Sequence, residues 1–90
     1  MTNKDKKALK EKAHRLKPVV TAGQAGLTTN VLAEIEIALN HHELIKVRLR
    51  SQDREQRKLQ AAQICTKTEA ILIQSIGQIS VLYRKNPDKH

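Results

Sequence analysis

Residues 45–50 have the strictest periodicity in the chain, because apolar and cationic side chains alternate through Ile-Lys-Val-Arg-Leu-Arg. Successive side chains of a β-strand point to opposite faces, so this pattern predicts a strand whose apolar members face a core. Lys46, Arg48 and Arg50 would share the opposite face, either as a solvated surface or as a contact surface for an anionic partner. This is the clearest strand in the chain, and the other elements are placed around it.

Helical periodicity is found in three other stretches. Apolar residues recur at spacings of three and four over residues 4–16, where Pro18 then stops the pattern, and over residues 30–42. A third helix is expected after the Ser-Gln-Asp cap at residues 51–53 and extends to about residue 66. Its buried stripe is expected to comprise Leu59, Ala62 and Cys65, widened by Ala61 and Ile64.

Three further strands are expected. Residues 19–22 are a short β-branched run, and residues 79–84 alternate again after a Gly-Gln turn. The nearly continuous apolar run at residues 70–76 is typical of a central strand that is covered on both faces. The element order α-β-α-β-α-β-β predicts an α/β fold with a four-stranded mixed sheet. Strands joined through helices would be parallel neighbours linked by right-handed crossovers, and the final hairpin would add an antiparallel strand.

The first strand leads into Gly23-Gln24-Ala25-Gly26, and Leu-Thr-Thr-Asn follows, with residue types that cap the N-terminus of a helix. A glycine turn that ends at a helix N-terminus presents backbone N–H groups and partial positive charge, both of which suit an anion. Glycines would also let a phosphodiester backbone approach the main chain without a Cβ in the way. The alternative is that both glycines serve only the strand-to-helix turn, because a G-x-x-G pattern alone is weakly specific.

The chain of 90 residues carries a net charge of +8, which favours a polyanionic partner, nucleic acid ahead of an anionic membrane. Residues 1–17 hold seven Lys and Arg against two acids, on a predicted helix whose narrow apolar stripe is Leu9, Ala13 and Leu16. The chain has one Tyr and neither Phe nor Trp, so it cannot stack bases on aromatic rings on any scale. We therefore expect it to grip backbone and shape.

The sequence offers no catalytic constellation. The glycines lack a Walker lysine and the third glycine of a dinucleotide fingerprint, and neither a nucleophile–base set nor a carboxylate pair is present. His41 and His42 would project about 100° apart on a helix, so no metal site is expected there. With Cys65 as the sole cysteine, no membrane-length apolar span and no secretory signal, we expect a cytoplasmic, non-enzymatic protein without a cofactor.

Five strings of the sequence resemble successive signatures of one family. The first three are Leu-Lys-Pro-Val-Val of residues 16–20, the glycine loop from Gly23 through Thr28, and Val-Leu-Ala-Glu-Ile of residues 31–35. The other two are Ala-Leu-x-His-His-Glu-Leu-Ile-Lys-Val of residues 38–47 and the closing Ile-Gly of residues 76–77 with Val-Leu-Tyr-Arg of residues 81–84. The family is the CRM domain, the chloroplast RNA splicing and ribosome maturation domain, in its bacterial single-domain, YhbY-type form. The resemblance covers about residues 3–85. It implies one domain over residues 1–90, with a polar tail at residues 86–90. The implied fold is a two-layer α/β domain similar to the C-terminal domain of bacterial translation initiation factor three, with an extra N-terminal helix.

The resemblance also implies RNA binding in precursors of the large ribosomal subunit, with a G-x-x-G loop comparable to the loop with which KH domains clamp an RNA backbone. Family loops often carry a basic or small polar residue between the glycines, whereas this loop has Gln24 and Ala25. Charge near the loop would then come from neighbours such as Lys17 or Lys46. The predicted RNA contacts are Lys6, Lys7, Lys10, Lys12, Arg15, Lys17, Gly23, Gln24, Ala25, Gly26, Lys46 and Arg48.

We therefore expect a monomeric protein whose partner is ribosomal RNA, with no membrane and no small-molecule substrate. Two alternatives remain open. One is a general binder of double-stranded nucleic acid. For such a protein, structured RNA would not clearly outcompete duplex DNA of equal length. The other is a protein-binding adaptor that uses the apolar stripe of the first helix and whose binding survives high salt.

Overall fold

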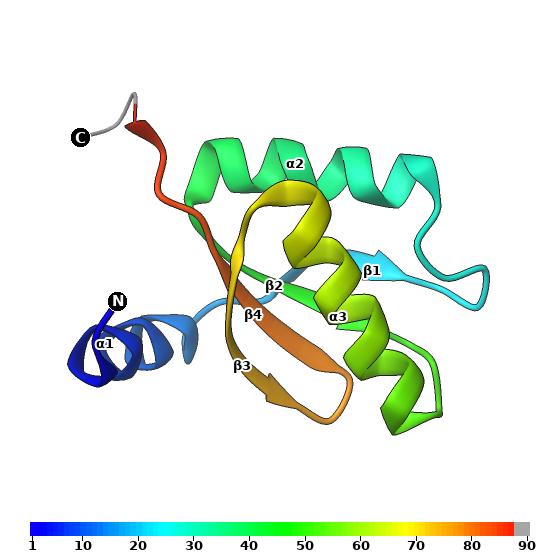
Figure 1. Cartoon of the computed structure of the whole chain (residues 1–90), viewed down its shortest axis with the longest axis horizontal. Helices are drawn as coiled ribbons and strands as arrows, with labels where there is room; N and C mark the ends of the chain where they lie inside the picture. Colours follow the sequence, from blue (N-terminus) through cyan, green and yellow to red (C-terminus); the bar gives the residue numbers. More distant parts are fainter. Residues whose placement is uncertain (88–90) are drawn as a thin grey trace.

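The computed structural model describes residues 1–87 and contains one four-stranded mixed sheet with three helices packed on it (Figure 1). The order of elements, α-β-α-β-α-β-β, confirms the prediction from the sequence. The elements are α1 Asn3–Ala13, β1 Pro18–Ala22, α2 Thr29–His42, β2 Leu44–Leu49, α3 Arg54–Thr68, β3 Ile71–Ile76 and β4 Ile79–Tyr83. In this part of the chain no helix has the length and apolar character needed to cross a bilayer.

The sheet has the strand order β1-β2-β4-β3. β1 and β2 are parallel neighbours as predicted, whereas β4 inserts between β2 and β3 and is antiparallel to both. The prediction that the apolar run at residues 70–76 is a central strand is therefore wrong: β3 lies at an edge, and its Ile71 and Ile76 are 42% and 63% exposed. The register shift between Leu72 and Gln74 interrupts this edge, which disfavours pairing with another chain.

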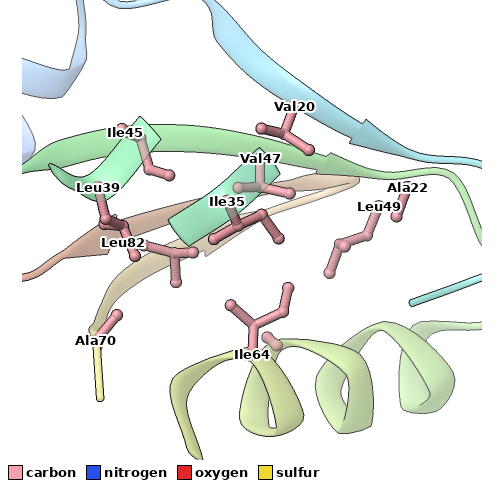
Figure 2. Packing of buried hydrophobic residues seen from close by; sticks show 11 residues of the cluster. Val20, Ala22, Ile35, Leu39, Ile45, Val47, Leu49, Ile64, Ala70 and Leu82 are labelled. Carbon is pink, nitrogen blue, oxygen red and sulfur yellow. The ribbon is translucent and has the colours of Figure 1, made fainter. Parts of the chain in front are cut away.

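The main core lies between the sheet and the layer formed by α2 and α3 (Figure 2). The alternation of β2 is confirmed, because Ile45, Val47 and Leu49 are each at most 1% exposed. Ile35 of α2 and Ile64 of α3 are completely buried against them. Each such side chain contributes roughly 1.5–3 kcal/mol by leaving water. The same alternation sends the cationic members of β2 to the opposite face of the sheet.

α3 turns a different side to the core from the stripe predicted by the sequence. Leu59 is 65% exposed and Ala62 is also exposed, so that part of the prediction is wrong. The buried residues of the helix are Gln60, Ala61, Ile64 and Thr68. Two of these buried residues, Gln60 and Thr68, are polar, so the buried side of the helix cannot be recognised from apolar periodicity. Thr68 can be buried because its Oγ1 donates a 2.7 Å hydrogen bond to the Ile64 carbonyl. Cys65 packs partly buried against the core, and burial raises the pKa of its thiol.

α1 packs on the other face of the sheet. Ala13 is 2% exposed and contacts Ile73 and Val81, with Leu9 half-buried beside them. The helix ends at Ala13, three residues earlier than predicted, and Leu16 is 36% exposed. The sheet thus covers Leu9 and Ala13 of the predicted apolar stripe, which leaves only Leu16 of the surface on which the adaptor alternative was based.

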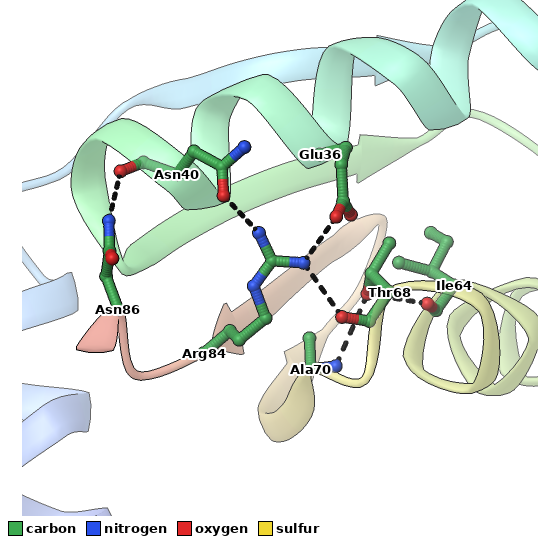
Figure 3. Close-up of polar contacts among 7 residues, drawn as sticks. All are labelled: Glu36, Asn40, Ile64, Thr68, Ala70, Arg84 and Asn86. Atoms are coloured by element: carbon green, nitrogen blue, oxygen red, sulfur yellow. Dashed lines mark hydrogen bonds and ion pairs between the residues drawn. The ribbon is translucent and has the colours of Figure 1, made fainter. Parts of the chain in front are cut away.

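Arg84, directly after β4, ties the last strand to both helices of the covering layer (Figure 3). Its Nη1 donates to Glu36 Oε1 at 2.7 Å and to the Thr68 carbonyl at 2.9 Å, and its Nη2 donates to Asn40 Oδ1 at 2.7 Å. Asn86 Nδ2 donates to the Asn40 carbonyl at 2.8 Å. The predicted polar tail therefore begins with an anchored residue, and its last three residues lie outside those described.

Candidate nucleic-acid interface

The glycine loop (residues 23–28) connects β1 to α2 through a tight turn. The N–H of Gly26 donates to the Gly23 carbonyl at 3.0 Å, and Gly26 has a φ of +78°, a left-handed conformation that disfavours any residue with a Cβ. Thr28 is the N-cap, and its Oγ1 accepts from the Val31 N–H at 3.1 Å. The sequence correctly predicts a glycine turn that ends at a capped helix, and only the second glycine is required by its φ.

The outer side of the glycine loop is exposed, whereas its inner side rests on α3. Gly23, Gln24 and Ala25 are all exposed, so the middle of the loop projects into solvent. Beneath it lies Gln60, only 8% exposed, whose Nε2 is 3.4 Å from the position that a Cβ on Gly26 would take. A ligand could therefore reach the loop only from its exposed side, because α3 supports the other side.

Gly26→Ala is expected to lower the free energy of unfolding by about 1–2 kcal/mol, because the residue would have to keep a left-handed φ, while its Cβ would meet Gln60 only at van der Waals distance. Gly23→Ala is the matched control. No atom lies within 4 Å of a Cβ at Gly23, and its φ is not positive, so its stability should stay within about 0.5 kcal/mol of the parent. Thermal unfolding followed by circular dichroism measures both, and equal losses would contradict this account of the turn.

The predicted contact residues do not form one cluster. α1 lies at one end of the molecule's 35 Å axis and the glycine loop lies at the other (Figure 1). The expectation that Lys17 and Lys46 neighbour the loop is wrong, because Lys46 pairs beside Pro18 at the start of β1, whereas the loop follows Ala22 at its end, roughly 13 Å further along the strand. The nearest backbone neighbour with a cationic side chain is Arg50, whose N–H donates to the Ala22 carbonyl at 3.0 Å.

The cations of residues 1–17 form a dense exposed surface, which we call the α1 surface. It comprises Lys4, Lys7, Lys10, Lys12, Arg15 and Lys17, with Lys6 half-buried at its border. None of these side chains forms an ion pair within residues 1–87. The Asp5 carboxylate instead accepts from the Thr2 N–H at 3.0 Å, a capping contact that lowers the pKa of Asp5. The charge of the α1 surface is thus available to a polyanion.

Sequence reasoning missed a second basic group. Arg54, Arg57 and Lys58, in the first turns of α3, line a cavity of about 290 Å³ together with Ser75 and Ser80 of the final hairpin. Their spacing of three and four residues places them on one side of the helix, and this spacing could have revealed the group in the sequence. Their proximity to the hairpin depends on the tertiary packing.

Apart from these basic surfaces, we find no candidate metal or catalytic site among the described residues. Within residues 1–87, no three His, Cys, Asp or Glu side chains are grouped so that they could hold a metal ion. His41 and His42 lie at the end of α2 with ring centroids 6.2 Å apart. The chemistry supported by this arrangement is the attraction and holding of an extended anion.

Comparisons with known proteins identify the fold and the family. The model of the CRS1/YhbY (CRM) domain matches residues 1–84. A Haemophilus influenzae protein named as an RNA-binding protein is 51% identical over 88 residues, which cover 98% of this chain and 89% of that protein. A Pseudomonas aeruginosa protein named as a probable RNA-binding protein is 46% identical over 87 residues, covering 97% of this chain and 84% of the relative. The solution structure of a hypothetical protein from Staphylococcus aureus superimposes with a TM-score of 0.85 at 31% identity, covering 96% and 90% of the two chains.

Proposed function

The chain belongs to the CRS1/YhbY (CRM) domain family, and we propose that it is a non-catalytic RNA-binding protein that acts on ribosomal RNA in precursors of the large subunit. The observation that carries the proposal is the α1 surface, whose exposed cations are in no ion pair within residues 1–87. The names of the two bacterial relatives support RNA as the partner. The large-subunit precursor is suggested by the resemblance of the sequence to bacterial members of the family.

Binding would combine a long-range and a local contribution. Neutralising phosphates with the cations of the α1 surface releases counterions from the RNA, which drives association without reading sequence. The glycine loop would position one stretch of the RNA backbone through main-chain N–H groups and Gln24. Arg50, next to the loop, supplies the local charge that the loop itself lacks.

Ala25 is the cleanest probe of the glycine loop, because it is exposed and bears no core contact. Ala25→Asp should leave the melting temperature nearly unchanged. It should weaken RNA binding by roughly 1–3 kcal/mol, because its carboxylate would stand where a phosphate is expected. Ala25→Lys should strengthen binding modestly and steepen the salt dependence. Titrations of RNA with the two variants test this, and parental binding by both would mean that the loop is only a turn.

The ribosomal part of the proposal is tested by sedimenting a cell extract through a sucrose gradient and probing each fraction for the protein. We expect it with particles that precede the mature large subunit, and we expect RNase treatment to release it. Migration with the small subunit, or at the top of the gradient with RNA binding intact in vitro, would overturn the ribosomal role and favour a general nucleic-acid binder.

A further inference from the structure

The face of the sheet that carries α1 is only partly covered by it, and the remainder is open. Two rows of side chains cross this open face from β2 through β4 to β3. In the first row Lys46 pairs with Val81, which pairs with Gln74. In the second row Arg48 pairs with Ile79, which pairs with Ile76. Each row thus has a cation on β2 and an aliphatic side chain on β4.

The first row and part of the second line a cavity of about 190 Å³, which is walled on one side by α1. Its floor is formed by Val81, Ile79 and Ile76, and its polar lining includes Lys10 and Lys46. No Asp or Glu is among the lining residues. The volume lies below the roughly 300–1,000 Å³ of pockets for drug-sized ligands, so it suits a single ring system.

The exposure of Ile76 is unusual for a large aliphatic side chain with no partner but water. This residue is 63% exposed on an edge strand and pairs with Ile79, while the cations of this face, Lys46 and Arg48, lie on β2 beyond β4. A flat aliphatic surface beside two lysines is complementary to a ligand that is apolar on its faces and anionic at one end. A nucleotide has both properties, since its base has apolar faces and its phosphate carries the charge.

We propose that this cavity binds one unpaired nucleotide of the RNA, with the base against Ile76 and Ile79 and the phosphate between Lys10 and Lys46. The proposal rests on the proposed RNA-binding function and makes it more specific. The Gln74 amide, on the far side of the floor from Lys46, has a donor and an acceptor with which to meet the edge of the base. The aliphatic floor takes the place of the Phe or Trp platform on which other single-strand binders stack bases.

An unpaired base is required by the geometry. In a duplex the faces of a base are covered by its stacked neighbours, so only a nucleotide that leaves the stack can lay its face on the floor of the cavity. The protein should therefore prefer RNA with a bulged or looped-out nucleotide over a fully paired duplex. The cations of the α1 surface and Arg48 would hold the flanking backbone on either side.

The test compares two RNA hairpins that differ by one bulged nucleotide. The parent protein should bind the bulged hairpin about fivefold or more tightly than the paired one. Ile76→Ser changes no charge and should bring the two affinities together by weakening only the bulged complex. Ile37→Ser is the matched control, because Ile37 is 58% exposed on α2, in the opposite layer, and this variant should keep the preference.

A second measurement uses the parent chain, so that it does not depend on the folding of a variant. Methyl resonances of Ile76 and Ile79 should shift when the bulged hairpin is added, and much less with the paired hairpin. Equal affinities of the parent for both hairpins would overturn the pocket and leave the proposed function standing. Binding of neither hairpin would overturn both. Methyl shifts that grow with protein concentration in the absence of RNA would assign this face to a second copy of the chain and would also overturn the proposal.

Discussion

Arg84→Met is expected to lower the free energy of unfolding by about 2–3 kcal/mol and the melting temperature by about 10–20 °C. The Arg84 side chain is 19% exposed, and its guanidinium donates to Glu36, Asn40 and the Thr68 carbonyl, so its loss removes the polar contacts that join the end of β4 to α2 and to the end of α3. Glu36 is 47% exposed and can return to water, which keeps the loss below that of a fully buried pair. Thermal and urea unfolding of the variant measure the effect.

Arg48→Met is the matched control, because it makes the same change on an exposed side chain of the neighbouring open face. Its stability should stay within about 0.5 kcal/mol of the parent. The two variants should separate folding from binding. Arg84→Met, studied well below its melting temperature, should bind RNA like the parent, whereas Arg48→Met should bind more weakly. Loss of RNA affinity in the folded Arg84 variant would contradict the structural role given to this residue.

Replacing four lysines of the α1 surface by Gln should lower RNA affinity by about two to three orders of magnitude at 0.15 M salt, provided that each contacts one phosphate. The substituted residues are Lys6, Lys7, Lys10 and Lys12. The slope of log affinity against log salt should become shallower by roughly one unit for each lost contact. Stability should change by about 0.5 kcal/mol or less for each substitution, because these side chains lie off the packed stripe.

The control for this experiment removes the same charge from other surfaces. Its two substitutions to Gln are at Lys67 and Lys85, which belong to neither basic group, and it is compared with a variant that carries Gln at Lys7 and Lys12 of the α1 surface. If position matters, the control should retain most of the affinity and of the salt slope, although its net charge matches that of the two-substitution α1 variant. Equal losses in both variants would show that net charge alone governs binding, and an unchanged slope in the first would show that the α1 surface is merely solvated.

The sequence predicts the elements well, because each depends on local periodicity and capping. The alternation of β2, the glycine turn and the caps of α2 and α3 all follow from neighbouring residues. The edge position of β3 does not follow, because an apolar run indicates burial without saying which strand will insert beside it. In α3 the polar residues Gln60 and Thr68 break the apolar stripe, so the apolar pattern wrongly placed Leu59 and Ala62 in the core.

The candidate site is predictable only in part. Exposed glycine-loop residues and a basic first helix can be inferred from the sequence. Which cation lies near the loop depends on the direction and length of the strands. In the structure this cation is Arg50 and not the predicted Lys46. Arg84 was part of a string that carried the family resemblance, and only the structure shows that its side chain ties the last strand to α2 and α3. The two rows across the open face require the strand order, which the sequence does not specify.

The central claim, that this protein binds RNA through phosphate contacts and shape, is tested most directly by one salt titration with a competitor. Affinity for a structured ribosomal RNA fragment is measured between about 50 and 200 mM salt, with and without duplex DNA of equal length. We expect affinity to fall by about two to four orders of magnitude, as for roughly five to eight phosphate contacts, and the RNA to outcompete the DNA clearly. An affinity that hardly changes with salt, or duplex DNA that competes as well as the RNA, would contradict the claim.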